Sequence, residues 1–154
     1  MKYITYFIFF AFLAALLLFL KNALQPRIEP LYLTGSGKCG ECHGLKNEGN
    51  QYDIWKNSRH SVAYSSLLSE KAKDFSARSN IVPPEENTLC LKCHTTEHFV
   101  TGVEKSGFFN ISEGVGCEAC HGAGSRYSPA EIMKDEDRFI YNGGIKGDEK
   151  TCRP

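Results

Sequence analysis

The chain has 154 residues with 18 basic and 18 acidic side chains, a length that allows one small domain and excludes a large multidomain enzyme. Its formal net charge of zero lacks the basic excess that neutralises phosphates, so we expect no nucleic-acid partner. Seven cysteines are far above ordinary usage for so short a chain, and six of them fall in pairs spaced C-x-x-C. This pattern points to cofactor chemistry.

The first segment is long and apolar. Residues 3–20 carry no charge, and as a helix they would span about 27 Å, close to the hydrocarbon thickness of a bilayer. The apolar part of a signal peptide is usually shorter, and no A-x-A-like cleavage site follows. We therefore expect residues 1–24 to form an uncleaved membrane anchor, with a cleaved signal sequence as the alternative. Either places the rest of the chain on the periplasmic side of the bacterial cytoplasmic membrane, anchored or free.

A linker is expected over residues 25–34, because Pro26 and Pro30 discourage continuation of a helix. From residue 35 onwards glycine, cysteine, histidine and charged residues replace the aliphatic run. This change of composition predicts a single domain over residues 35–154.

One long helix is expected within this domain. Asp53 is a suitable N-cap, and the sequence from there to about Phe75 contains no glycine or proline. Helical spacing would then place His60 on one face with Tyr64 and Leu67, beside apolar and aromatic neighbours.

The domain contains three copies of a C-x-x-C-H signature, at residues 39–43, 90–94 and 117–121. This signature is typical of covalent c-type haem attachment, in which each cysteine forms a thioether with one haem vinyl group. The histidine that follows lies beneath the iron as its proximal ligand. The predicted attachment residues are Cys39, Cys42, Cys90, Cys93, Cys117 and Cys120, and the predicted proximal ligands are His43, His94 and His121.

Two other uses of the cysteine pairs explain less of the pattern. Zinc sites also use C-x-x-C pairs, but they need no histidine directly after the second cysteine of every pair. A disulfide framework favours an even number of cysteines and does not need those histidines either. Haem attachment outside the cytoplasm also agrees with an exported chain.

The seventh cysteine stands in the last four residues, Thr151-Cys152-Arg153-Pro154. This sequence is the beginning of a further C-x-x-C-H motif whose last two residues are missing. We therefore expect three complete haem c sites and a fourth, truncated site at Cys152, with a lone free cysteine as the alternative.

The histidines are too few for the irons. Three six-coordinate irons need six axial ligands, and the chain has five histidines. At least one iron is therefore open, takes another kind of ligand, or receives a ligand from beyond residue 154. His60 and His98 remain as distal candidates, although His98 is close in sequence to its own proximal partner and would serve a neighbouring haem or face solvent. Met133 and Tyr127 are weaker candidates, because a methionine more commonly fills a gap in packing.

The motifs resemble the tetrahaem cytochromes of the c554 type, in the wider cytochrome c-552/4 family. The resemblance covers roughly residues 37–154 and includes Trp55, the tripeptide at 58–60 and the block 114–124, which is its most specific part. It implies a mainly α, loop-rich multihaem cytochrome c fold organised around stacked haems, with bis-histidine ligation at most irons. Two departures are Ala123, where relatives often have proline, and the absence of a histidine after His121.

These observations predict a multihaem c-type cytochrome that carries electrons outside the cytoplasmic membrane. Its partners would be redox proteins or quinol-linked donors, together with the membrane itself through the N-terminal helix. The alternative is a haem enzyme that acts on a small nitrogen or sulfur oxide at an open iron, with Lys92, Arg126 and Tyr127 as candidate anion-binding groups. The sequence identifies no catalytic residue. Because the soluble part is short, covalent haem would also supply much of the apolar core.

Overall fold

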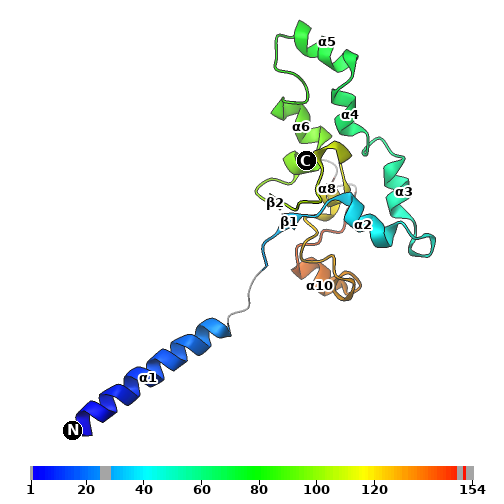
Figure 1. Ribbon diagram of the computed structural model, residues 1–154. Helices are drawn as coiled ribbons and strands as arrows, with labels where there is room; N and C mark the ends of the chain where they lie inside the picture. The colour runs from blue at the N-terminus through cyan, green and yellow to red at the C-terminus, as the bar shows by residue number, and fades with distance from the viewer. Residues whose placement is uncertain (1, 25–28, 149–150, 152–154) are drawn as a thin grey trace.

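The computed structural model describes residues 2–24, 29–148 and 151 (Figure 1). Short helices separated by loops dominate the described part of the chain, which confirms the mainly α class. The helices of the first half are α1 (Lys2–Ala23), α2 (Ser36–His43), η1 (Lys46–Glu48), α3 (Gln51–Lys56), α4 (Ala63–Leu67) and α5 (Glu70–Arg78). Those of the second half are α6 (Thr88–His94), α7 (Thr96–Phe99), η2 (Ile111–Glu113), α8 (Cys117–His121), α9 (Ala130–Met133) and α10 (Glu136–Tyr141).

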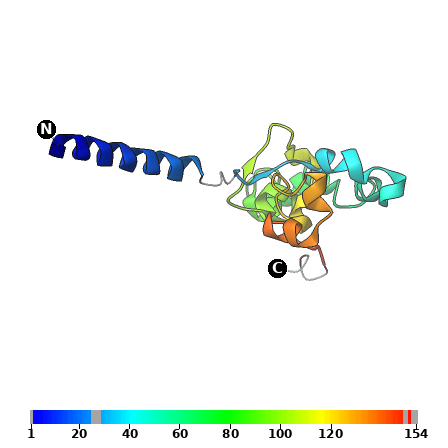
Figure 2. The same ribbon diagram turned by 90° about the horizontal axis from the view of Figure 1, so that it is seen from below.

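Helix α1 stands clear of the other elements (Figures 1 and 2). Its segment Tyr6–Ala23 is 18 residues long and apolar enough, by length and composition, to cross a membrane. None of this segment is buried against the rest of the described structure. A helix that is apolar all round and has no protein cover is what a membrane span or a signal sequence requires.

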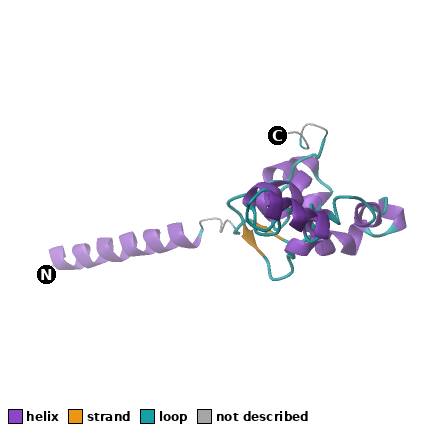
Figure 3. Ribbon diagram, turned by 90° about the horizontal axis from the view of Figure 1, so that it is seen from above, coloured by secondary structure: helices purple, strands orange, loops and turns teal. Residues whose placement is uncertain are grey.

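A small parallel sheet joins the start of the domain to the loop before the third motif (Figure 3). Strand β1 (Tyr32–Leu33) pairs with β2 (Glu104–Lys105), and Tyr32 lies opposite Glu104 in the register. Leu33 is completely buried. Tyr32 and Leu33, which lie near the end of the predicted linker, are thus packed into the domain.

The expectation of one helix from Asp53 to Phe75 is wrong. The structure has three shorter helices, α3, α4 and α5, and the residue before the first of them is Asn50. Side-chain hydroxyls interrupt the helical hydrogen bonds between α3 and α4. Ser61 Oγ donates to the carbonyl of Lys56 at 2.8 Å, and the Ser58 hydroxyl accepts from the backbone N–H of His60 at 3.2 Å. Because serine competes in this way for backbone groups, His60 lies in an exposed turn rather than on a helical face.

The apolar core of the described domain is thin. Its buried apolar side chains are Leu33, Leu67, Leu91, Ala119, Ala123 and Tyr127. Large apolar side chains such as Phe75 and Leu89 remain exposed. A domain of this size needs more buried apolar surface or covalent staples to offset the conformational entropy of its chain. The motif cysteines are the obvious positions for such staples.

We predict that the domain does not fold stably without haem. The region from residue 29 onwards, fused to a cleavable export signal and produced in cells that lack c-type haem maturation, should show little helical circular dichroism and rapid proteolysis. The same region from maturation-competent cells should be helical and protease-resistant. Equal helicity and resistance in both preparations would show that the thin core suffices.

Candidate haem-binding site

Each C-x-x-C-H motif forms the end of a helix, with its histidine as the last helical residue of α2, α6 or α8. Helical geometry places two cysteines three residues apart on the same face, as attachment to one edge of a haem requires. Glycine follows the third motif for a steric reason. Gly122 has φ +79°, and a Cβ there would lie 2.6 Å from the carbonyl oxygen of Gly143.

The three motif histidines are oriented in the same way, through Nδ1. This atom lies 2.7 Å from the carbonyl oxygen of Ala63 in His94 and 3.0 Å from that of Ile145 in His121. In His43 it lies 3.3 Å from the side-chain oxygen of Gln51. Carbonyl oxygens only accept hydrogen bonds, so Nδ1 is the donor, and in the neutral ring Nε2 then keeps its lone pair. No described residue is hydrogen-bonded to these three Nε2 atoms, and this is the tautomer that an iron ligand needs.

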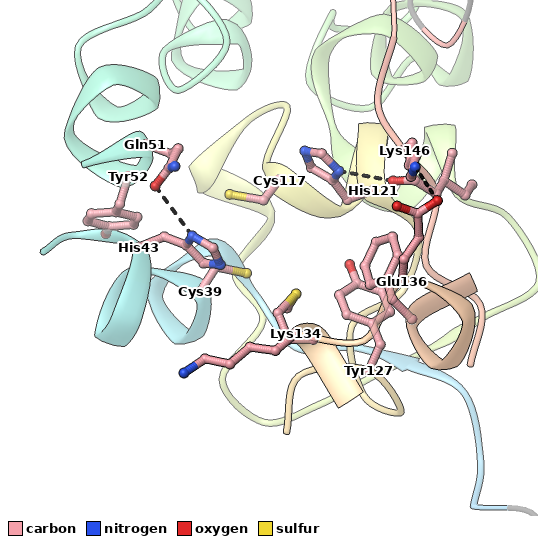
Figure 4. A pocket seen from close by; sticks show the side chains of 13 residues that line it. Cys39, His43, Gln51, Tyr52, Cys117, His121, Tyr127, Lys134, Glu136 and Lys146 are labelled. Carbon is pink, nitrogen blue, oxygen red and sulfur yellow. Dashed lines mark hydrogen bonds and ion pairs between the residues drawn. The ribbon is translucent and has the colours of Figure 1, made fainter. Parts of the chain in front are cut away.

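A cavity of about 520 Å³ lies between the first and third motifs (Figure 4). Cys39 and His43 of α2 line it together with Cys117 and His121 of α8. Its remaining walls are Gln51 and Tyr52 near α2, and Tyr127, Met133, Lys134, Glu136, Phe139, Ile145 and Lys146 from the C-terminal part. The size lies in the usual range of cofactor sites, and the donor set of thiols and imidazoles fits covalently attached haem.

The second motif does not line this cavity. His94 is instead tied to α4, through the carbonyl of Ala63 and through Ser66 Oγ at 3.2 Å. The structure therefore brings the first and third motifs together across 78 residues of sequence, counted from Cys39 to Cys117. The second motif occupies a separate place beside α4 and α7.

The thiols of Cys39 and Cys117 interact with each other while they are free. A hydrogen bond from Cys39 lowers the pKa of Cys117 to about 7, against the opposing effect of burial. The same hydrogen bond, together with burial, raises the pKa of Cys39. Cys117 is thus the more acidic thiol of the two. Thioether formation would remove both titrations.

A buried carboxylate inside the third motif connects the two helices of this site. Glu118 is 1% exposed and accepts hydrogen bonds from the backbone N–H groups of Thr34 at 2.8 Å, Gly35 at 2.8 Å and Gly124 at 2.6 Å. The Thr34 hydroxyl adds another at 3.0 Å. A buried charge is tolerated only when it is satisfied in this way. The carboxylate holds the chain that enters α2 against α8.

A second carboxylate reinforces this connection. Glu113 accepts from the backbone N–H of Ser36 at 2.9 Å and from its hydroxyl at 3.1 Å. Desolvation raises the pKa of Glu113, and the hydrogen bonds from Ser36 oppose that rise. The Ser36 hydroxyl in turn accepts from the backbone N–H of Cys117 at 3.1 Å. The first residues of α2 and α8 therefore share one polar link.

The second motif joins the same network through Thr96, which is completely buried. Its hydroxyl accepts from the backbone N–H of Gly116 at 2.7 Å, and its backbone N–H donates to the carbonyl of Gly114 at 3.0 Å. Gly114 has φ +75°, and a Cβ there would clash with the carbonyl oxygen of His60. Gly114 and Gly116 lie directly before the third motif. These contacts hold them between α7 and the turn that contains His60.

Two of the candidate anion-binding groups are already engaged. The Tyr127 hydroxyl donates to the carbonyl of Gly122 at 2.7 Å, and its ring meets Phe139 edge-on with the centroids 4.8 Å apart. Burial raises the pKa of Tyr127, so the phenol stays protonated. Arg126 Nε donates to the carbonyl of Glu29 at 2.6 Å. Lys92 is exposed on α6.

The two distal candidates lie outside the cavity. The side chain of His60 is exposed, while its carbonyl accepts from the N–H of Val115 at 3.0 Å, two residues before Cys117. His98 is half-buried on α7, and its Nδ1 lies 2.9 Å from the Thr95 hydroxyl. The bond from Val115 places the His60 turn next to the third motif, and the bond from Gly116 to Thr96 does the same for α7, which contains His98. Cys152 lies outside the described residues.

The residues that hold the motifs together have no signature in the sequence. Glu118 occupies one of the two variable positions of its motif, where an acidic residue suggests only a solvated side chain. Glu113, Ser36 and Thr96 belong to no recognisable sequence motif. Their donors and acceptors come from segments that only the folded chain brings near, so no local signal identifies them.

Cys39, Cys42, Cys90, Cys93 and Cys117 form no disulfide, and no group of three or more His, Cys, Asp or Glu side chains among the described residues is arranged around one metal ion. Paired thiols with an adjacent imidazole that is held through Nδ1 define a haem-binding protein of the cytochrome c class.

Residues 38–122 match the family of cytochrome c554 and c-prime, and the chain belongs to this family. The chain is similar to cytochrome c-554 of Nitrosomonas europaea, with 29% identity over 124 residues. That alignment covers 75% of this chain and 48% of the relative, so the chain spans about half the length of the curated relative. No solved structure matches the chain. The predicted family is confirmed, and haem c is the cofactor that the family implies.

We predict that Glu118→Gln destabilises the haem-loaded protein by about 1–3 kcal/mol. The NH₂ group of glutamine cannot accept a hydrogen bond, so one side of the new side chain would face backbone N–H groups that now donate to the carboxylate. Denaturant unfolding followed by circular dichroism measures this loss. Glu86→Gln is the matched control, since Glu86 is exposed and should change stability by less than about 0.5 kcal/mol. Equal stability of the two variants would contradict the role given to Glu118.

Proposed function

We propose that the chain is a multihaem electron carrier with three complete haem c sites. Cys39 and Cys42, Cys90 and Cys93, and Cys117 and Cys120 would form the thioethers, and His43, His94 and His121 would be the proximal ligands. The observation that carries this proposal is the shared orientation of the three imidazoles, each held through Nδ1 with Nε2 left for iron. Haem iron supplies one-electron chemistry when bound, and the protein positions the haems and sets their potentials.

The arrangement of the motifs supports electron transfer between haems. The first and third motifs line one cavity, so the haems attached there would be direct neighbours. Hydrogen bonds of Glu118, Glu113 and Thr96 connect the three motif helices. Fixed spacing between cofactors favours electron transfer, because no motion is needed between successive steps.

We propose His60 and His98 as the histidines that serve as distal ligands. Both lie on segments that are anchored next to the third motif, and no described residue is hydrogen-bonded to Nε2 of either side chain. We place residues 35–154 in the cytochrome domain, with Cys152 in a fourth, incomplete attachment site. Residues 1–24 would anchor this domain on the periplasmic side of the membrane, or direct its export if they are cleaved. Redox proteins or quinol-linked donors would supply the electrons.

The test is the covalent haem content and the spin state of the exported protein. Mass spectrometry of denatured protein should show three haems, one of which is lost in the double variant Cys90→Ser/Cys93→Ser. Electron paramagnetic resonance of the oxidised protein should show low-spin signals. A colourless denatured protein would overturn the proposal. A high-spin iron that binds cyanide or nitric oxide quickly would instead support an enzyme acting on a small oxide.

A further inference from the structure

The cavity between α2 and α8 contains two proximal histidines, His43 and His121, and no histidine among its other lining residues. His60 and His98 are carried by other segments, and His94 is held against α4. If the haems of both motifs lie in this cavity, its walls therefore offer no histidine as a distal ligand for either iron. Any distal ligand from these walls must be a different side chain.

Most polar side chains of the cavity walls are already committed. The Tyr127 hydroxyl is bonded to the carbonyl of Gly122. Glu136 forms an ion pair with Lys146, and Gln51 holds Nδ1 of His43. The Tyr52 ring packs on Trp55, with the ring centroids 5.4 Å apart. The Tyr127, Glu136 and Gln51 side chains would have to break these contacts to approach an iron.

Three donors remain, Tyr52, Lys134 and Met133. A tyrosine binds haem iron as the phenolate, so it must first lose a proton. Lys134 is exposed, and a hydrated ammonium is a poor ligand. Met133 is half-buried, and its thioether is neutral, so it binds haem iron without losing a proton. Helix α9 also holds this residue in place, because the N–H of Met133 donates to the carbonyl of Pro129 at 2.9 Å.

We propose that Met133 is the distal ligand of one of the two irons that His43 and His121 hold in this cavity. This inference rests on the haem attachment proposed above. Histidine–methionine ligation raises the reduction potential relative to two histidines, so this iron would be the high-potential centre among the three haems. It would be the last of the three to give up its electron.

The sequence makes the test specific, because its only methionines are Met1 and Met133. The oxidised, haem-loaded protein should show the weak far-red absorption band that arises from sulfur-to-iron charge transfer. Met133→Leu should lose this band and convert one iron to a high-spin form. Met133→His should also lose the band but stay low-spin, with a lower potential at one haem. Ile132→Val, on the same short helix, should keep the band.

Covalent haem is counted by mass spectrometry in every variant, which separates the two proposals. Missing haem would defeat the proposed function itself. A full haem complement without the far-red band in the unmodified protein would overturn only the role of Met133. A band of unchanged intensity in Met133→Leu would overturn it as well.

Discussion

The arrangement of the motifs depends on one buried carboxylate, Glu118. It accepts hydrogen bonds from Thr34 and Gly35, which lie more than eighty residues earlier and lead directly into α2. Because its donors are mostly backbone N–H groups, the contact fixes the path of the chain and not only the position of a side chain. The charge would be costly without these donors, so the segment that carries the first motif can take few other positions relative to the third.

Polar links of this kind replace the apolar core that a domain of similar size usually has. Ser36, Thr95 and Thr96 are buried, while much of the apolar surface of α5 and α6 is exposed. Buried polar side chains beside exposed apolar ones are expected if haem is the main apolar component of the interior. The protein would then need its own interactions chiefly for the register of the motif helices, and directional hydrogen bonds define register better than apolar contacts do.

The motifs, the mainly α class and the family could be predicted because each depends on residues close together in sequence. The break between α3 and α4 could not, since it depends on how Ser58 and Ser61 compete for backbone groups at a site with no glycine or proline. The roles of Glu113 and Glu118 also escaped prediction, because their partners are distant in the chain. For the same reason the sequence did not indicate which two motifs would line one cavity.

The pairing of the first and third motifs has a consequence for the proposed carrier. Electron transfer between haems depends on their order in space, and this order need not follow the order of motifs along the chain. The second motif, whose His94 is held against α4, lies outside the cavity that the first and third motifs line, so its haem would lie apart from the two haems attached there. Strand β1, which follows the linker from α1, enters the domain at Glu118 and α2, directly beside the shared cavity. In an anchored protein, the two haems of this cavity would therefore be attached close to the point where the chain from the membrane helix enters the domain.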